Sequence, residues 1–449
     1  VAAHVVLPYL ITGQTSERQA AVEVLRKVGE VGLHQAAALM THENSDVRRA
    51  ALRVFQASKC SGPEVLRLLP QIHQDIGRRL QDVDSRVRGV AALALCRLGC
   101  KAAKHFADDL LFILQSGTGT SMVDGAELRD VLAALAMLGQ SASWAANTVA
   151  NCLWLEQWSL RRAAAETYGQ ICGDHRPSNG LVEGPTSDND DEDDDMTPMM
   201  DREAAALQLS KLLKDHVVDV AESAAKALAC MGLHGACHAL QLANCLEDDY
   251  GLAQAALAAL LKLLSSECFA TKEAAAAGVA TYFKRASASS TARGCLIQAL
   301  LRESRCEERN VREECIRALG SLAQQERSSR SGWLQQILKE VIYAALEDVQ
   351  MSVKRCAIEV LGKLDLPPDS QAADQLESVL KLLAKSSSSR QLQRYALQAL
   401  HQVENCASAT VHDFGSVPSG VKGARSGAPQ RHEPATRGKK KVGEWIIDH

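Results

Sequence analysis

The sequence predicts an all-α protein whose helical hairpins stack into an elongated solenoid. One motif recurs along most of the 449 residues, and the apolar residues within each copy follow helical spacing, with no competing strand pattern. Aromatic residues make up only 4% of the chain, so Ala and Leu must fill its interior. This composition favours many thin, closely packed helices over one large globular core.

The recurring motif is an acidic turn, a Val-Arg pair and a run of small apolar residues. Its clearest copy is LQDVDSRVRGVAALALCRLG, Leu80 to Gly99. From Val87 to Leu98 the apolar residues fall at i, i+3, i+4, i+7, i+8 and i+11, which predicts an amphipathic helix. Asp84 or Ser85 can cap its N-terminus, and Gly99 suits its end. With a preceding helix over Val65 to Leu80, the segment predicts a helical hairpin.

The spacing of the motif predicts how many hairpins there are. Steps of 40 and 41 residues lead from Val47 to Val87 and on to Leu128, and later steps range from 32 to 60. Two-helix repeats of about 30 to 47 residues are typical of helical solenoids, so we expect nine or ten hairpins. One hairpin buries too little apolar surface to offset its ordering entropy, and stacking on like neighbours supplies the rest. Thr271 to Lys284 is an extra helical segment, where we expect a degenerate repeat.

Composition divides the chain into four parts: repeats in residues 1–172 and 201–405, an acidic disordered loop in 173–200 and a flexible basic tail in 406–449. Glu183 to Asp195 contains eight acidic residues and no basic ones, and like charges at that density repel and do not pack. Between Val421 and Lys441 there are seven Lys or Arg residues against one Glu.

The arrangement Asp82, Val87, Arg88 and Ala91, repeated in Asp348, Val353, Lys354 and Ala357, resembles HEAT and HEAT-like (armadillo-type) repeats. The resemblance covers most of the chain from Ser16 to Val403. It implies a right-handed α-solenoid in which the acid of the turn and the base of the second helix form an ion-pair ladder between repeats. The expected ladder residues are Asp82, Arg88, Asp348 and Lys354. Ala221 and Gln393 replace the base in two repeats, so we expect the ladder to be interrupted.

The predicted function is that of a non-catalytic scaffold or adaptor, whose second helices line a concave face that holds a protein partner. The charged residues expected to contact the partner are Arg49, Arg162, Glu222 and Glu359. Two alternatives remain open. HEAT-like repeats also resemble those of phycobilin lyases, which implies a lyase or enzyme-associated module. Basic loops between repeats could instead bind tubulin or nucleic acid, although a net charge of −4 disfavours nucleic acid.

No catalytic residue, cofactor or metal is predicted. The Cys and His residues between Cys230 and Cys245 lack the short Cys-x-x-Cys knuckle of zinc sites. We interpret Trp144, Trp154 and Trp158 as core packing, because large aromatic residues are usually buried. Fourteen Cys residues without a Cys-x-x-Cys pair indicate reduced thiols, so we expect a cytoplasmic protein, with the nucleus as an alternative. No membrane span is expected. The chain starts with Val1 and not Met, which leaves a fragment or a processed product open.

Overall fold

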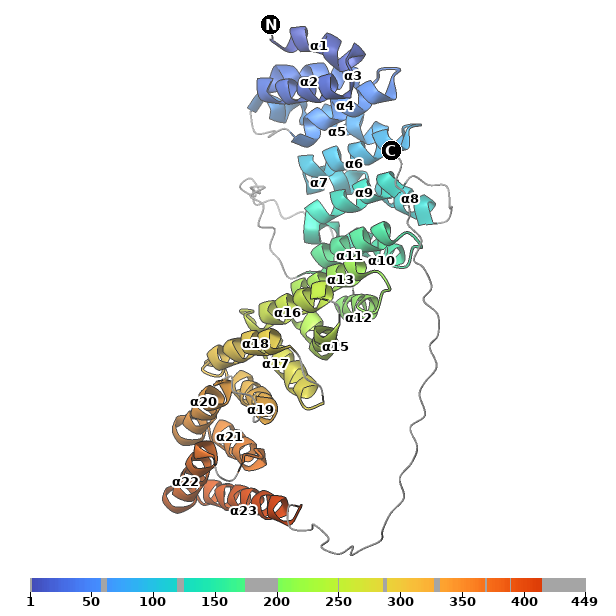
Figure 1. The fold of residues 1–449 in the computed structure, drawn as a ribbon. Coiled ribbons are helices and arrows are strands. Elements are labelled where there is room, and N and C mark those ends of the chain that lie inside the picture. Colours follow the sequence, from blue (N-terminus) through green and yellow to red (C-terminus); the bar gives the residue numbers. More distant parts are fainter. Residues whose placement is uncertain are drawn as a thin grey trace, which may run out of the picture.

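The computed structural model describes residues 2–57, 63–118, 125–173, 201–248, 250–285, 289–326, 332–367, 370–387 and 389–413. All regular structure in these ranges is helical, and the helices stack one hairpin on the next into a long solenoid (Figure 1). The predicted all-α solenoid is therefore confirmed. The acidic loop beyond Gly173 and the tail beyond Asp413 lie outside the described residues.

Seven hairpins precede residue 269 and form two layers of helices. The first helices of the hairpins are α1 (Ala2–Thr12), α3 (Glu30–Leu39), α5 (Pro63–Arg78), α8 (Ala107–Thr118), α10 (Ala146–Cys152), α12 (Arg202–Leu212) and the pair α14 (Gly232–Ala236) and α15 (Ala239–Asn244). The second helices are α2 (Thr15–Val28), α4 (Ser45–Ala57), α6 (Ser85–Leu98), α9 (Gly125–Leu138), α11 (Trp158–Cys172), α13 (Val218–Cys230) and α16 (Tyr250–Leu264). Short helical segments connect them: η1 (Arg79–Gln81), α7 (Cys100–His105), η2 (Gly139–Ala145) and η3 (Cys245–Glu247).

Three further hairpins end the described part of the chain. Their first helices are α18 (Ser290–Glu303), α20 (Trp333–Glu347) and α22 (Gln371–Ser386). Their second helices are α19 (Arg309–Glu326), α21 (Met351–Lys363) and α23 (Arg390–Asp413). The described part therefore holds ten hairpins, as the repeat length predicted. Helix α23 continues to Asp413, beyond the boundary predicted at residue 405.

A single helix, α17 (Phe269–Phe283), separates the two sets of hairpins. It packs against α15 on one side and α19 on the other, whereas α16 packs against α13 and α18. The layer of first helices thus continues through α17 into the layer of second helices α19, α21 and α23 (Figure 1). The predicted degenerate repeat is wrong, because this segment is one helix and not a hairpin. For the same reason, second helices share one layer within each set but not along the whole solenoid.

Helix α6 shows how the local sequence specifies each hairpin. The Asp84 side chain caps the helix by accepting the backbone N–H of Arg86, and Gly99 ends it with a positive φ of 135° that L side chains rarely adopt. The apolar stripe that predicted the helix, including Val87, Ala91 and Leu95, is fully buried. The cap, the apolar stripe and the terminal glycine therefore specify the same helix, from Ser85 to Leu98.

Small residues let successive second helices approach each other closely. A Cβ atom added to Gly169 of α11 would lie 2.5 Å from the Cβ of Ala227 on α13. The buried core consists mainly of Ala, Leu and Val and runs along the solenoid between the two layers. This narrow core explains why the chain needs so few aromatic residues.

Candidate functional site: the second-helix surface and its ion-pair ladder

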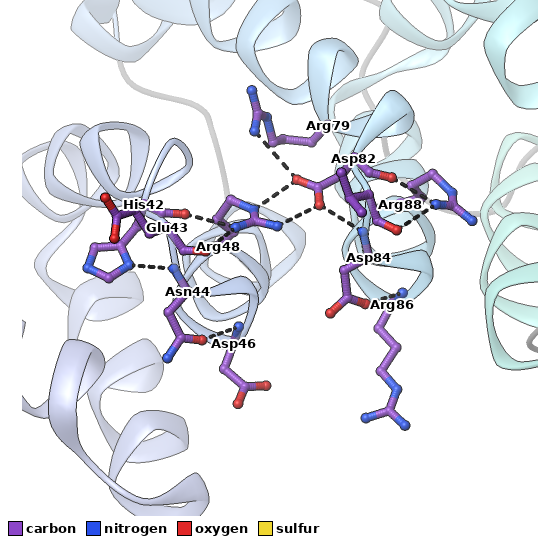
Figure 2. A network of polar contacts seen from close by, with 11 residues as sticks. His42, Glu43, Asn44, Asp46, Arg48, Arg79, Asp82, Asp84, Arg86 and Arg88 are labelled. Atoms are coloured by element: carbon purple, nitrogen blue, oxygen red, sulfur yellow. Dashed lines mark hydrogen bonds and ion pairs between the residues drawn. The ribbon is translucent and has the colours of Figure 1, made fainter.

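A buried ion pair joins the second helix of one repeat to the turn of the next. The Arg48 guanidinium on α4 donates to both carboxylate oxygens of Asp82, at 2.8 and 2.6 Å, and the Asp82 side chain is only 2% exposed (Figure 2). The same guanidinium donates to the backbone carbonyls of His42 and Glu43, at 2.9 and 2.8 Å. One side chain thus orders its own turn and also binds the adjacent repeat.

The same geometry recurs along the chain. Arg88 donates to the carbonyl oxygen of Asp82 (Figure 2). It also donates to the Glu127 carboxylate, so Asp82 and Arg88 belong to consecutive rungs. In three further rungs, a base on one helix pairs with an acid at or just beyond the C-terminal end of a later helix. These rungs are Arg161 with Asp215, Lys272 with Glu303, and Arg312 with Asp348. Each rung fixes the register of two stacked helices.

The expected ladder residues have the following contacts. Asp82 pairs with Arg48, and Arg88 pairs with Glu127, while Asp348 accepts from Arg312 at 2.8 and 3.0 Å. Lys354 donates to the carbonyl oxygen of Leu346 at 2.7 Å and forms no ion pair within the described part of the chain, so it is not a rung of the ladder there. The stacked hairpins and these rungs together confirm the resemblance to HEAT-like repeats.

Sequence reasoning missed Arg48, Arg161 and Arg312 as rung residues, although each follows the marker Val or Leu that defined the period. It also missed Glu127, which lies in the first turn of α9 and not in the preceding turn. The repeat alignment itself was the signal that could have found the three arginines.

Electrostatics keep the ladder carboxylates of Asp82 and Asp215 ionised. Burial alone would raise the pKa of Asp82, but hydrogen bonds from Arg48 and from the Asp84 backbone N–H hold that pKa below its usual value. The pKa of Asp215 is lowered in the same way: burial opposes ionisation, and the Arg161 and Val217 hydrogen bonds outweigh it. The Arg48–Asp82 and Arg161–Asp215 rungs are therefore charged pairs at neutral pH.

Three of the predicted partner-contacting residues lie at one position of their repeats. Arg49, Arg162 and Glu222 each follow the ladder position directly, on the second helices α4, α11 and α13. Arg162 bonds Glu166 at 3.0 Å and lies 3.8 Å from Asp219 of the neighbouring helix α13. These pairs are half-exposed, so their charges remain available to a partner.

Glu222 and Glu359 also form ion pairs on their own helices, and Glu222 is partly buried whereas Glu359 is exposed. Glu222 lies 3.4 Å from Lys226, and Glu359 lies 3.6 Å from Arg355. Glu359 is on α21, a second helix beyond α17, and therefore belongs to the opposite layer. The four predicted residues do not form one continuous surface.

An open groove of 840 Å³ lies between α2 and α4. Its lining includes three arginines, Arg18, Arg49 and Arg53, and the carboxylates Glu23 and Asp46. Of these residues, only Arg49 was among the predicted partner contacts.

Two of the three tryptophans differ from the prediction. Trp144 packs against the core, but Trp154 and Trp158 are 53% and 44% exposed. Both lie where the chain turns from α10 into α11, and this turn carries their side chains away from the layer interface. The core-packing interpretation is therefore wrong for Trp154 and Trp158.

The Cys and His residues between Cys230 and Cys245 are spread over several helices. Cys245 is buried, Cys230 is half-buried and Cys237 is exposed. Within the part of the chain that the structure describes, no three His, Cys, Asp or Glu side chains gather closely enough to hold a metal ion. None of the described helices is both long and apolar enough to span a bilayer.

Comparisons with known proteins give the following similarities. No family model matches the sequence, and no curated protein matches it significantly. An engineered protein of the Northeast Structural Genomics Consortium is similar in structure, with 20% identity and a TM-score of 0.38 over 90% of this chain and 99% of that chain. Kap121p has 14% identity and a TM-score of 0.34, over 92% of this chain and 46% of its own.

Kap95, in the structure of the Kap95:Nup1 complex, has 14% identity and a TM-score of 0.40. The match covers 92% of this chain and 58% of that chain. This chain therefore spans about half the length of the Kap121p and Kap95 chains that it matches.

Proposed function

We propose that this chain is a non-catalytic scaffold that binds a protein partner on the second helices of its first seven hairpins. One observation carries the proposal: the charges of Arg49, Arg162 and Glu222 lie at equivalent positions of stacked second helices, and buried ion pairs join α4 to the next repeat and α11 to α13. A rigid row of spaced charges suits recognition of a long surface better than catalysis, which needs groups that converge on one point.

We further propose that it acts in the cytoplasm, with the nucleus as an alternative compartment.

The charges along the surface of the second helices change from one end to the other. Arg49 and Arg53 lie at the α4 end, whereas Glu166, Asp219 and Glu222 outnumber the nearby bases at the α11–α13 end. A partner that fits would carry complementary charges in the opposite order, which gives both orientation and specificity.

The test is affinity capture from lysate of the source cell with the full chain and with the charge-reversed variant Arg49→Glu/Arg162→Glu/Glu222→Arg. A partner bound on this surface should be retained by the wild type and lost from the variant. The matched control reverses Lys339, an exposed residue of α20, which should leave the captured set unchanged. Equal capture by wild type and charge-reversed variant would place any partner elsewhere and contradict the proposal.

A further inference from the structure

We propose that the groove between α2 and α4 binds an extended, acidic peptide segment of a partner protein. The inference rests on the proposed scaffold function and names the chemistry of the partner at one end of the surface. The groove, defined by residues Thr15 to Glu23 of α2 and Asp46 to Gln56 of α4, has a volume of 840 Å³. This volume is within the range of about 300 to 1,000 Å³ of sites that hold ligands.

The charges in the groove are unbalanced toward positive. Asp46 lies between two of the three lining arginines, 2.7 Å from Arg49 and 3.4 Å from Arg18. One carboxylate therefore serves two guanidinium groups. Arg53 is exposed and pairs with no acidic side chain in the described part of the chain. Asp46 therefore does not neutralise the three lining arginines, and a net positive charge remains around it.

The second lining carboxylate does not restore the balance. Glu23 is engaged by two cations of its own helix, since it bonds Arg26 and lies 3.6 Å from Lys27. The residues that line the groove therefore carry three arginines against two carboxylates, in a chain whose formal net charge is −4. This local excess of positive charge, against the sign of the whole molecule, favours an anionic ligand.

The remaining lining residues favour a peptide over a nucleic acid. Gln19 and Gln56 lie on opposite walls of the groove, and amide side chains can donate to and accept from an extended peptide backbone. Among the described residues, no aromatic side chain lines the groove, whereas single-stranded nucleic acids are usually held by stacking on aromatic residues. Guanidinium groups bind carboxylates through paired hydrogen bonds, so Arg53 and Arg49 suit Asp or Glu side chains of the ligand.

The experiment measures binding of a fluorescein-labelled Glu/Ser peptide to the full chain by fluorescence anisotropy. Arg49→Glu/Arg53→Glu should weaken the affinity at least about tenfold, while the matched control Lys339→Glu should leave it within about twofold. An unchanged far-UV circular dichroism spectrum verifies that the variants are folded. Equal loss of affinity in Arg49→Glu/Arg53→Glu and in Lys339→Glu would overturn the inference.

Two parallel measurements keep the outcome unambiguous. A single-stranded oligonucleotide is titrated in the same way, and tighter binding of the oligonucleotide in the Arg49/Arg53 groove would overturn the peptide assignment. A second chain carries amides in place of the eight carboxylates of residues 183–195, which could compete for the groove. Peptide binding to either chain supports the inference, and binding to neither refutes it. If capture depends on Arg162 and Glu222 while no peptide binds, the scaffold proposal stands and this inference fails.

Discussion

The ion pair between Arg161 and Asp215 should hold α11 and α13 together, and Arg161→Met tests this role. The two residues are 54 positions apart, and both side chains are only 7% exposed. The guanidinium donates to the carboxylate at 2.7 and 2.9 Å and to the carbonyls of Leu155 and Glu156 at 2.9 and 2.8 Å. Methionine keeps most of the aliphatic stem and removes all four hydrogen bonds.

The expected cost follows from burial. Removing Arg161 leaves the Asp215 carboxylate buried without its counter-ion, and breaking a buried pair in this way costs about 3 to 5 kcal/mol. The neighbouring pair Arg162–Glu166 is about half-exposed on both sides, so its loss should cost at most about 1 kcal/mol. Arg162→Met is therefore a matched control on the same helix.

Hydrogen exchange of the backbone amides measures the effect where it occurs, because a solenoid need not unfold in one step. A loss of about 3 kcal/mol should speed exchange in α11 and α13 by about a hundredfold in Arg161→Met. Exchange in α20 should not change. If Arg161→Met and Arg162→Met gave equal exchange rates in α11 and α13, the ladder would not be what joins these repeats, and the reasoning would be refuted.

Three other predictions concern helix packing at Gly169, the ladder residue Asp82 and the buried thiol of Cys96. Gly169→Leu should destabilise the α11–α13 contact by about 1 to 3 kcal/mol through overlap with Ala227, and a lowered urea midpoint for loss of helical circular dichroism would verify it. The lowered pKa of Asp82 means that its stabilisation is complete above the unfolded-state value near pH 4 and is lost as the pH falls through the folded-state value. Acid titration of Asp82→Asn should therefore show a shallower loss of stability than wild type, and an identical profile would contradict this. Burial raises the pKa of Cys96 to about 12, so this thiol should react with a disulfide reagent only after unfolding, whereas exposed Cys100 should react in the native protein; mass spectrometry of labelled peptides distinguishes them.

Features that depend on neighbouring residues were predictable from the sequence. Helix α6, its cap at Asp84 and its end at Gly99 follow from side-chain types within one segment, and the repeat length predicted the number of hairpins. The partner of each rung residue was harder to predict from the sequence, because the pairing of Arg88 with Glu127 depends on how two repeats stack on each other. The exposure of Trp154 likewise depends on the path of a turn, which residue type alone does not specify.

The groove between α2 and α4 shows the same limit. Arg49 was predicted from its exposed position on a second helix, but Arg53 and the two glutamines gain significance only when α2 and α4 lie side by side. Tertiary placement, and not residue chemistry alone, creates this candidate site.

The single helix α17 has a consequence for any partner longer than a few repeats. A ligand that followed the second helices from α4 onward would have to cross from one edge of the stack to the other to remain on second helices at α19 and α21. A straight, rod-shaped partner cannot do this. A straight partner that runs past α17 along one layer would instead contact second helices on one side of α17 and the first helices α18 and α20 on the other.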